Sequence, residues 1–258
     1  MTPVCFIKFG ESEFMNTLAN GDFFFSHAKR FAEIEENEFI KGQGDLFEGK
    51  AELAATSARV YSLDDDSLIA NIKLTAFTLS AEYVPYKPVY CLSVFDVADC
   101  VEYIDEKNYK LIFSTELVTS IKSHFPKADT AVVFTDPRKL IESLLSGAKS
   151  DIQHGYVNYF NMHPVDLEWV KFVHDNKGEK VDGGIRYTML VENSYKLLFC
   201  KDLFFKEEKE YRFVYSNDSI RKPEVRRFEI GGQATIKTMD ELFNSGLNVV
   251  NGAVKNIG

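Results

Sequence analysis

A dense cluster of charge lies inside an aromatic stretch of this sequence, LFFKEEKEYRFVY at residues 203–215. Side chains alternate between the two faces of a strand, so Glu208, Glu210 and Arg212 are expected on one face and the aromatic residues from Tyr211 onward on the other. The aromatic face is suited to burial in a core, while the opposite face places two carboxylates and a guanidinium in a row. The stretch predicts either a reactive site or the solvated side of a strand.

Two carboxylates on one strand face suit a specific kind of chemistry. They can bind a ribose hydroxyl and stabilise an oxocarbenium-like cation while a leaving group departs. Each also raises the pKa of its neighbour. The competing interpretation is an exposed edge strand on which Arg212 neutralises Glu208 and Glu210. Charged strand faces are common, so the spacing alone favours this second interpretation.

Two other segments carry polar groups in an unusual setting. Lys8 lies among apolar residues in FIKFG, where it either contacts a phosphate or ribose or is an ordinary exposed lysine. In KGQGDLFEGK, residues 41–50, glycines either bend the backbone so that Asp45 and Glu48 point inward or form a surface loop with solvated acids. The Gly-x-Gly of this segment lacks the third glycine and the following helix of a dinucleotide fingerprint.

Sequence motifs for a nucleophile or a metal are absent. No Gly-x-Ser-x-Gly, P-loop or His-Glu-x-x-His pattern occurs. The cysteines at positions 5, 91, 100 and 200 form no Cys-x-x-Cys pair, so we expect free thiols in a reducing compartment and assign no metal ligand.

The composition predicts a soluble, cytoplasmic protein. The 258 residues are 45% apolar and include 22 Phe and 12 Tyr, which suffices for a sizeable core and favours sheet-rich packing. The start MTPVCFIKFG lacks the features of a signal peptide, and no apolar run approaches the ~20 residues that span a bilayer. We therefore expect no membrane partner. The net charge of −9 disfavours unspecific nucleic acid binding, although RKPEVRRF at 221–228 is a local basic patch.

Strands and helices must position these residues. Hydrophobic periodicity predicts strands at 4–10, 22–26, 58–63, 68–79, 89–95, 130–135, 156–160, 195–200 and 211–216. It predicts helices at 11–21, 27–39 (capped by Ser26), 116–125, 137–147 and 239–246. Residues 176–184 are expected to form a loop, and 224–232 a hairpin partner of 211–216. Steady strand–helix alternation is missing, so we expect one α+β domain over residues 1–258, with a mixed, mostly antiparallel twisted sheet and flanking helices.

Four segments, taken in order, resemble a bacterial domain family of unknown function: FIKFGESEFMNTLANGDFFFSHAKRFAE, KGQGDLFEG, VYCLSVF and KLLFCKDLFFKEEKEYRF. That family has a basic residue on its first strand, then a Phe-Ser strand, a Gly-Asp-x-Phe-Glu-like loop, a Cys-x-Ser strand and a late Glu-x-Glu-Tyr-Arg strand. The corresponding positions here are Lys8; Phe25 and Ser26; Asp45, Phe47 and Glu48; Cys91 and Ser93; and Lys201, Phe205, Glu208, Glu210, Tyr211 and Arg212. The family's middle Trp-Ser-His-Tyr-like segment has no counterpart in residues 96–128.

Members of that family are associated with phage defence and abortive infection, and its layout is similar to that of ADP-ribosyltransferases. The resemblance implies an ADP-ribosyltransferase-like toxin or defence effector that uses NAD as a substrate. In this reading, Glu210 and Glu208 are catalytic, and Glu210 stabilises the oxocarbenium formed as nicotinamide leaves. The residues implied for NAD binding are Lys8, Phe24, Ser26, Tyr90, Ser93 and Arg212, with Asp45, Glu48 and Tyr211 adjoining them. Lys8 stands where those enzymes usually have Arg or His.

The implied acceptor is a nucleic acid or a protein, and the implied partner is an antitoxin or another defence-system protein. Two other functions stay open. One is a non-enzymatic sensor or interaction module, in which Asp45, Glu48, Glu208 and Glu210 tie the loop to the sheet. The other is a nuclease, in which the same four acids bind a divalent metal.

Two structural expectations follow from these interpretations. A shared site requires Lys8 and Glu210 on the same side of the molecule. An ordered loop requires Asp45 or Glu48 to bind a group such as Arg212.

Overall fold

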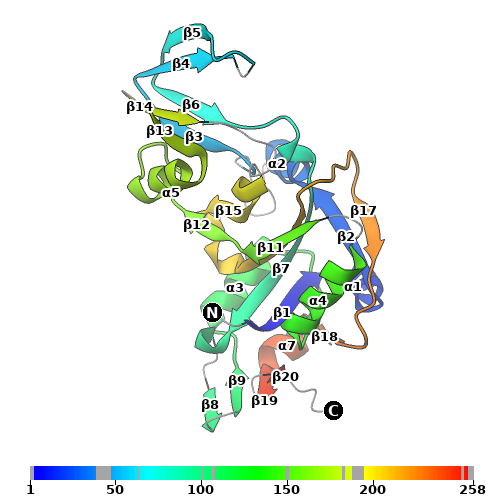
Figure 1. Cartoon of the computed structure of the whole chain (residues 1–258). Helices are drawn as coiled ribbons and strands as arrows, with labels where there is room; N and C mark the ends of the chain where they lie inside the picture. The colour runs from blue at the N-terminus through cyan, green and yellow to red at the C-terminus, as the bar shows by residue number, and fades with distance from the viewer. Residues whose placement is uncertain are drawn as a thin grey trace.

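The computed structural model of the chain describes residues 3–38, 48–62, 64–99, 102–105, 108–148, 151–181, 184–187, 195–250 and 253–254. A large sheet runs through the middle of the molecule, and several short sheets lie above it in Figure 1. Within the described ranges, no helix is long and apolar enough to cross a membrane.

The large sheet has eight strands, and its neighbouring strands are antiparallel. Six of them follow in the order β11 (Ile152–Tyr156), β16 (Glu210–Tyr215), β7 (Pro88–Asp96), β1 (Pro3–Gly10), β10 (Thr130–Phe134) and β18 (Ala234–Thr238). The other two, β2 (Asp22–His27) and β17 (Glu224–Arg227), pair with each other, and β2 also joins β7. This mostly antiparallel arrangement with separate helices confirms the expected α+β class.

Three strands pair with β7. Strand β16 follows one edge of it, whereas β1 occupies the opposite edge at Ser93 and beyond, and β2 joins that edge at Val89. Residues 90–92 of β7 have no partner on this second edge among the described strands. The predicted closeness of the first strand to the 209–215 strand is confirmed, because only β7 separates them.

One face of the sheet carries the main aromatic core. Helices α1 (Ser12–Ala19) and α4 (Pro137–Gly147) cover this face with Leu18 and Leu144, which pack among the rings of Phe6, Phe23 and Phe213. Along each strand, the residues of this core alternate with residues whose side chains point to the opposite face, because successive side chains of a strand point to opposite sides of a sheet.

The opposite face is covered in two parts. One part packs against α3 (Thr115–His124), α7 (Met239–Ser245) and a four-stranded sheet made of β20 (Ala253–Val254), β19 (Leu247–Val250), β9 (Asn108–Leu111) and β8 (Glu102–Asp105). The other part packs against α2 (Ala28–Glu38), the 3-10 helices η1 (Val84–Tyr86) and η3 (Tyr195–Phe199), and the turn that begins at Glu48.

The short sheets at the top of Figure 1 are two-stranded. Helix α5 (Leu167–Lys177) packs the fully buried Trp169 among residues of the first, third and fourth of the two-stranded sheets named next. The strands are β3 (Ala51–Ala54) with β6 (Ala76–Leu79), β4 (Ser57–Tyr61) with β5 (Leu68–Lys73), β13 (Gly178–Val181) with β14 (Gly184–Tyr187), and β12 (Asn158–Phe160) with β15 (Cys200–Asp202). The remaining 3-10 helices are η2 (Val97–Asp99) and η4 (Leu203–Glu208).

Capping side chains set the starts of several helices. The hydroxyl of Ser114 and the carboxylates of Asp136 and Asp166 accept backbone N–H groups at the first turns of α3, α4 and α5. Thr238 and Glu241 form a reciprocal capping box on α7. These caps satisfy N–H groups that have no partner within the helix.

Four sequence predictions about elements are wrong. Strand β17 pairs with β2 and not with β16. The stretch 68–79 forms two strands, β5 and β6, and the polar segment 176–184 contributes a strand, β13, as well as the end of α5. Residues 195–199 form the 3-10 helix η3 in place of a strand.

Candidate functional site

Strand β16 carries the alternation that the sequence predicted. Its aromatic residues pack into the main core: Tyr211, Phe213 and Tyr215. Glu210 and Arg212 point to the opposite face, where the Arg212 side chain is 1% exposed. Glu208 lies outside the strand, at the end of η4, so the charged row on the strand begins at Glu210.

Arg212 binds three groups inside the protein. Its Nε donates to Oε2 of Glu210 at 2.7 Å, and its two terminal nitrogens bind both carboxylate oxygens of Glu48. Nη1 also donates to the backbone carbonyl of Leu198 at 2.5 Å. The fork of a guanidinium matches a carboxylate in this bidentate way. The prediction that Glu48 binds Arg212 is confirmed, whereas Asp45 lies outside the described residues.

Lys201 of β15 links the Glu208 carboxylate to that of Glu210. Its Nζ donates to Oε2 of Glu208 at 2.5 Å and to Oε1 of Glu210 at 3.3 Å, and lies 4.2 Å from the centre of the Phe205 ring. Between the two glutamates, Lys209 takes a left-handed conformation with φ 48°, which turns the chain from η4 into β16. We call Glu48, Lys201, Glu208, Glu210 and Arg212 the buried charge network.

Burial and neighbouring charge shift the pKa values of Glu208 and Glu210 in opposite directions. Burial raises the pKa of Glu208 to about 8, and the nearby Glu210 adds to this effect, although Lys201 opposes it. Burial alone would raise the pKa of Glu210 as well, but Arg212 and Lys201 hold it well below its usual value. Near neutral pH Glu208 therefore keeps a proton, whereas Glu210 is ionised between Lys201 and Arg212.

The two cations stay charged. Burial alone would lower the pKa of Lys201, but Glu210 and Glu208 raise it above its usual value. The pKa of Arg212 is likewise raised well above its usual value: burial opposes the charged form, whereas Glu210 and Glu48 stabilise it. Ion pairs of this kind persist inside a protein only when hydrogen bonds satisfy the charged groups.

Three further polar side chains border the network. The backbone N–H of Glu210 donates to the hydroxyl of Tyr159 at 2.7 Å, and burial together with Glu210 raises the pKa of that tyrosine. Ser93 lies opposite Glu210 in the β7–β16 register. Burial and then Glu210 raise the pKa of the Cys91 thiol to about 12, so this thiol stays protonated and unreactive near neutral pH.

Lys8 points away from the network. In the register, Ile7 and Glu210 both lie opposite Ser93, so Lys8, the next residue along β1, projects from the other face. Its Nζ donates to the carbonyl of Cys91 at 2.8 Å, in the unpaired part of the β7 edge. The expected convergence of Lys8 and Glu210 on one face is therefore wrong, because the strand period separates them.

The other residues implied for NAD binding do not gather at one place. Phe24 is 54% exposed beside Val225, its partner in the β2–β17 register. Ser26 lies opposite Val89, so Phe24 and Ser26 share one face. Tyr90 is buried on the opposite, aromatic face, where burial raises its pKa well above the usual value.

Ser26 does not cap α2. His27 takes that role, since its Nδ1 accepts the backbone N–H of Arg30 at 3.1 Å. The Ser26 hydroxyl is buried and finds no hydrogen-bond partner among the described residues. Tyr211, expected next to the site, faces away from the network and bonds His154 Nδ1 through its hydroxyl at 2.6 Å.

Sequence reasoning named Lys201 among the motif positions but gave it no role in the site, and it missed Tyr159. The signal for Lys201 was its position in FCKDLFF, where a lysine between apolar residues needs an acid nearby if it is buried. No comparable signal marks Tyr159, because its contact with Glu210 is to a backbone N–H across 51 residues of chain.

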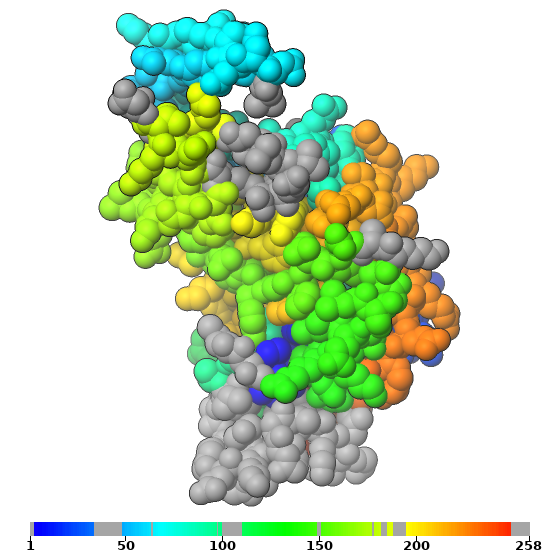
Figure 2. Space-filling view, viewed as in Figure 1, coloured from blue at the N-terminus to red at the C-terminus, as the bar shows by residue number. Residues whose placement is uncertain are grey.

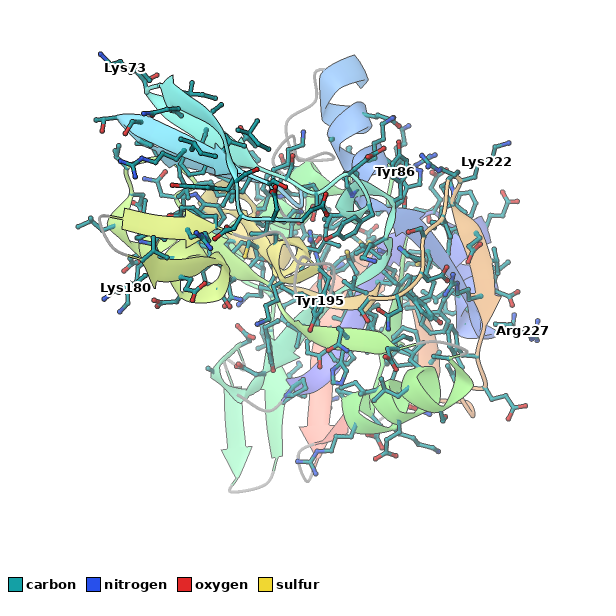
Figure 3. All side chains as sticks on the ribbon, turned by 45° about the horizontal axis from the view of Figure 1, so that its top comes forward. Lys73, Tyr86, Lys180, Tyr195, Lys222 and Arg227 are labelled. Carbon is teal, nitrogen blue, oxygen red and sulfur yellow. The ribbon has the colours of Figure 1, made fainter. Side chains whose placement is uncertain are left out.

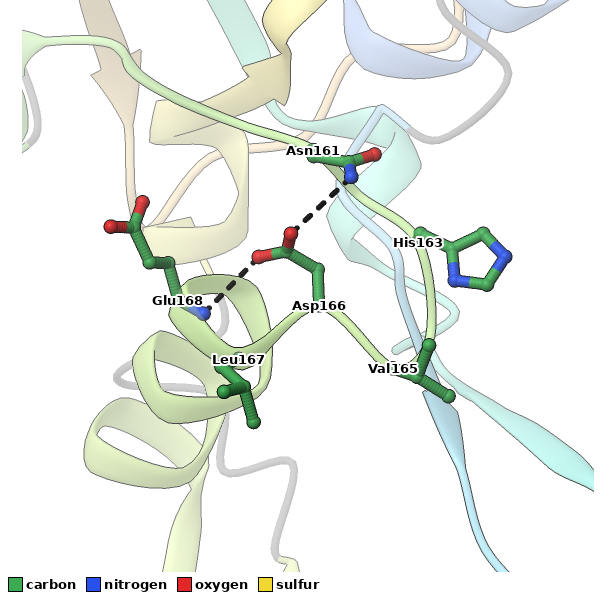
Figure 4. Close-up of a pocket in the computed structure, with 6 residues that line it drawn as sticks. All are labelled: Asn161, His163, Val165, Asp166, Leu167 and Glu168. Atoms are coloured by element: carbon green, nitrogen blue, oxygen red, sulfur yellow. Dashed lines mark hydrogen bonds between the residues drawn. The ribbon is translucent and has the colours of Figure 1, made fainter.

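Two open cavities lie away from the network. One, of about 400 Å³, is drawn in Figure 4 and is lined by Asn161, His163, Val165, Asp166, Leu167 and Glu168. Its Asp166 carboxylate is engaged by the start of α5 and by the Asn161 amide, so it caps a helix. The other, of about 500 Å³, lies along α5, β13 and β14.

Two of the four cations in the basic patch at 221–228 form ion pairs. Arg226 binds Asp218 and Glu224, and Arg227 binds Asp22 at 3.2 Å. Figure 3 shows Lys222 and Arg227 on the same side of the molecule. Across the described residues, no group of three or more histidine, cysteine and acidic side chains is arranged to hold a metal ion. Three of the four acids of the nuclease interpretation, Glu48, Glu208 and Glu210, bind Arg212 or Lys201, and the fourth, Asp45, lies outside the described residues.

Comparisons of this chain with protein-family models, with curated proteins and with solved structures give no match.

Proposed function

We propose that this chain is a non-enzymatic interaction module, in the cytoplasmic phage-defence setting that the sequence resemblance implies. The observation that carries the proposal is the pair of hydrogen bonds that the Glu210 carboxylate accepts. One of its carboxylate oxygens accepts a hydrogen bond from Lys201 and the other accepts one from Arg212. A carboxylate that stabilises a transition state must face the charge that develops on the substrate. Both oxygens of Glu210 instead face cations of the protein.

In this function the buried charge network specifies and holds the fold. Arg212 ties the turn at Glu48 and the carbonyl of Leu198 to the central strand β16. Lys201 ties β15 and the end of η4 to the same strand. Removing Glu48 or Glu210 leaves an uncompensated charge inside the protein, which costs about 3–5 kcal/mol. The module then acts through its surface, on an antitoxin or another protein of the defence system.

The test is incubation of the purified chain with labelled NAD and a bacterial lysate, followed by separation of the protein and nucleic acid fractions. We expect no label in either fraction above the level of a control without the chain. Transfer of label that is lost in the Glu210→Gln variant would overturn the proposal.

A second candidate is the ADP-ribosyltransferase-like effector that uses NAD. It is favoured by one observation: the first strand, the Cys-x-Ser strand and the Glu-x-Glu strand are neighbours in the sheet, as β1, β7 and β16. Glu208 and Glu210 also lie side by side on Lys201 with their pKa values shifted in opposite directions. Paired acids with separated pKa values are a pattern of acid–base sites. The labelling experiment decides between the two candidates.

A further inference from the structure

The β4–β5 hairpin is an amphipathic ribbon. Directly opposite residues share a face, and the pairs Val60–Ala70 and Ala58–Ile72 make one face apolar. The alternate pairs, Arg59–Asn71 and Ser57–Lys73, make the other face polar. Val60 is 41% exposed and Ile72 is 47% exposed, so the apolar face is open to solvent.

The end of the ribbon near its turn is also apolar. The register shifts between Val60 and Tyr61, and beside this irregularity Leu68 and Ile69 are 56% and 66% exposed. With Val60 and Ile72, these residues supply four of the fifteen large apolar side chains that are exposed in the described chain. Such concentration on one short hairpin marks an interaction surface.

The turn end of the ribbon contacts β14. Tyr61 is the residue after Val60. The guanidinium carbon of Arg186, on β14, lies 5.4 Å from the centre of the Tyr61 ring. The same Arg186 pairs with Asp66 in the turn at 3.4 Å. Figure 2 shows the hairpin as a slab at the top of the molecule that stands clear of most of it. An isolated two-stranded hairpin is marginally stable in water, so cover over its apolar face would stabilise it.

The charges on the ribbon indicate which molecule covers its apolar face. The turn end carries the exposed Asp64 and Asp65, beside the Asp66 that Arg186 pairs with, and the opposite end carries the exposed Lys73. Two ribbons laid antiparallel, apolar face to apolar face, bring the acidic end of each near the basic end of the other. A parallel arrangement would bring the acidic ends of both copies together.

We propose that the apolar face of β4–β5 binds the same face of a second copy of this chain, with the two ribbons antiparallel about a two-fold axis. Such an interface is self-complementary, as most homodimer contacts are. A ribbon offers far fewer residues than the roughly 20–30 a side of a standard interface, so the dimer is reversible and forms with rising concentration. This inference rests on the proposed function, an interaction module, and identifies a second copy of the chain as the partner.

The test is sedimentation velocity of the full chain over about a hundredfold range of concentration, which spans roughly 2.7 kcal/mol of association free energy. We expect a monomer–dimer equilibrium that Ile72→Asp abolishes. The control is Ile236→Asp, which places the same charge on an isoleucine of β18 that is 43% exposed, and which should leave the dimer unchanged. A monomer at all concentrations, or a dimer that survives Ile72→Asp, overturns the pairing.

A charge exchange keeps the proposal testable if Ile72→Asp disturbs the hairpin. Lys73→Glu alone and the double variant Asp64→Lys, Asp65→Lys alone should each dimerise more weakly than the parent chain. Mixed together they should form a heterodimer, because the changed charges are again opposite. Absence of recovery in the mixture overturns the antiparallel arrangement. A monomer that also transfers no label from NAD would refute the pairing and leave the interaction module in place.

Discussion

At the scale of single residues, Arg212 decides how the central sheet and the segments above it fit together. A guanidinium that is 1% exposed is held by Glu48, Glu210 and the carbonyl of Leu198, so its five donors are largely satisfied without water. Apolar side chains of similar volume would often be equally stable at such a place. We therefore interpret the network as a device that selects one position for the turn at Glu48.

Loss of the Glu48 carboxylate should destabilise the protein strongly. Glu48→Ala leaves Arg212 buried with one counter-charge fewer, and we expect the free energy of unfolding to fall by about 3–5 kcal/mol. The control is Glu224→Ala, which removes a partner of Arg226 whose carboxylate side chain is 42% exposed and should cost less than about 1 kcal/mol. Urea unfolding of both variants measures the difference, and equal losses would show that the buried pair contributes no more than the exposed one.

Glu208 should make stability depend on pH in an unusual direction. Its folded pKa of about 8 lies above that of a glutamate in the unfolded chain, so the folded state holds a proton that the unfolded state has lost. The stabilisation from this group is complete below the unfolded pKa and is lost as pH rises toward 8.

Glu208→Gln mimics the protonated form and should remove that dependence. We expect the variant to match the parent chain in melting temperature near pH 5 and to exceed it near pH 8.5. Melting curves across this range test the expectation. Parallel pH profiles for the two proteins would mean that Glu208 is ionised throughout.

At the scale of elements, the start of α2 depends on His27. Replacing it with Ala removes the acceptor of the Arg30 N–H and should lower stability by about 1 kcal/mol, the usual loss for a helix cap. Ser26→Ala should be neutral or stabilising, because it removes a buried hydroxyl that has no partner among the described residues. Thermal unfolding of the two variants measures both effects. A larger loss of stability in Ser26→Ala than in His27→Ala would show that Ser26 is the cap.

Most elements were predictable from local pattern, and the errors have physical causes. Helices α3 and α4 follow Ser114 and Asp136, whose capping chemistry is visible in the sequence. The pairing of β17 with β2 was not predictable, because neighbours in sequence usually form the hairpin, whereas contacts such as that of Arg226 over the Phe25 ring join strands far apart in the chain.

The candidate site was predictable in part. Alternation along β16 placed Glu210 and Arg212 on one face, and the glycine-rich segment supplied Glu48. Lys8 was misplaced because its position relative to Glu210 depends on the registers of two strand pairs, which no local pattern in the sequence fixes.

In the whole molecule, the buried charge network, to which we assign the fold, lies apart from the exposed ribbon that we propose as a binding surface. The network lies under the turn at Glu48 and under η3, whereas the β4–β5 hairpin stands at the far end of the molecule in Figure 1. Changes in one should therefore leave the other intact, since substitutions at distant sites usually act independently. Glu48→Ala, measured at a temperature where it stays folded, should retain the concentration-dependent dimer.

We propose that Glu210 serves the fold and not a reaction. The variant Glu210→Gln tests this, with melting temperature and NAD consumption measured on the same preparation. Glutamine keeps the shape but removes the anion between Lys201 and Arg212. We therefore predict a lower melting temperature, with a loss of about 3 kcal/mol or more in the free energy of unfolding, and no NAD consumption by either protein. Unchanged melting together with NAD consumption that only the parent chain shows would overturn this role for Glu210.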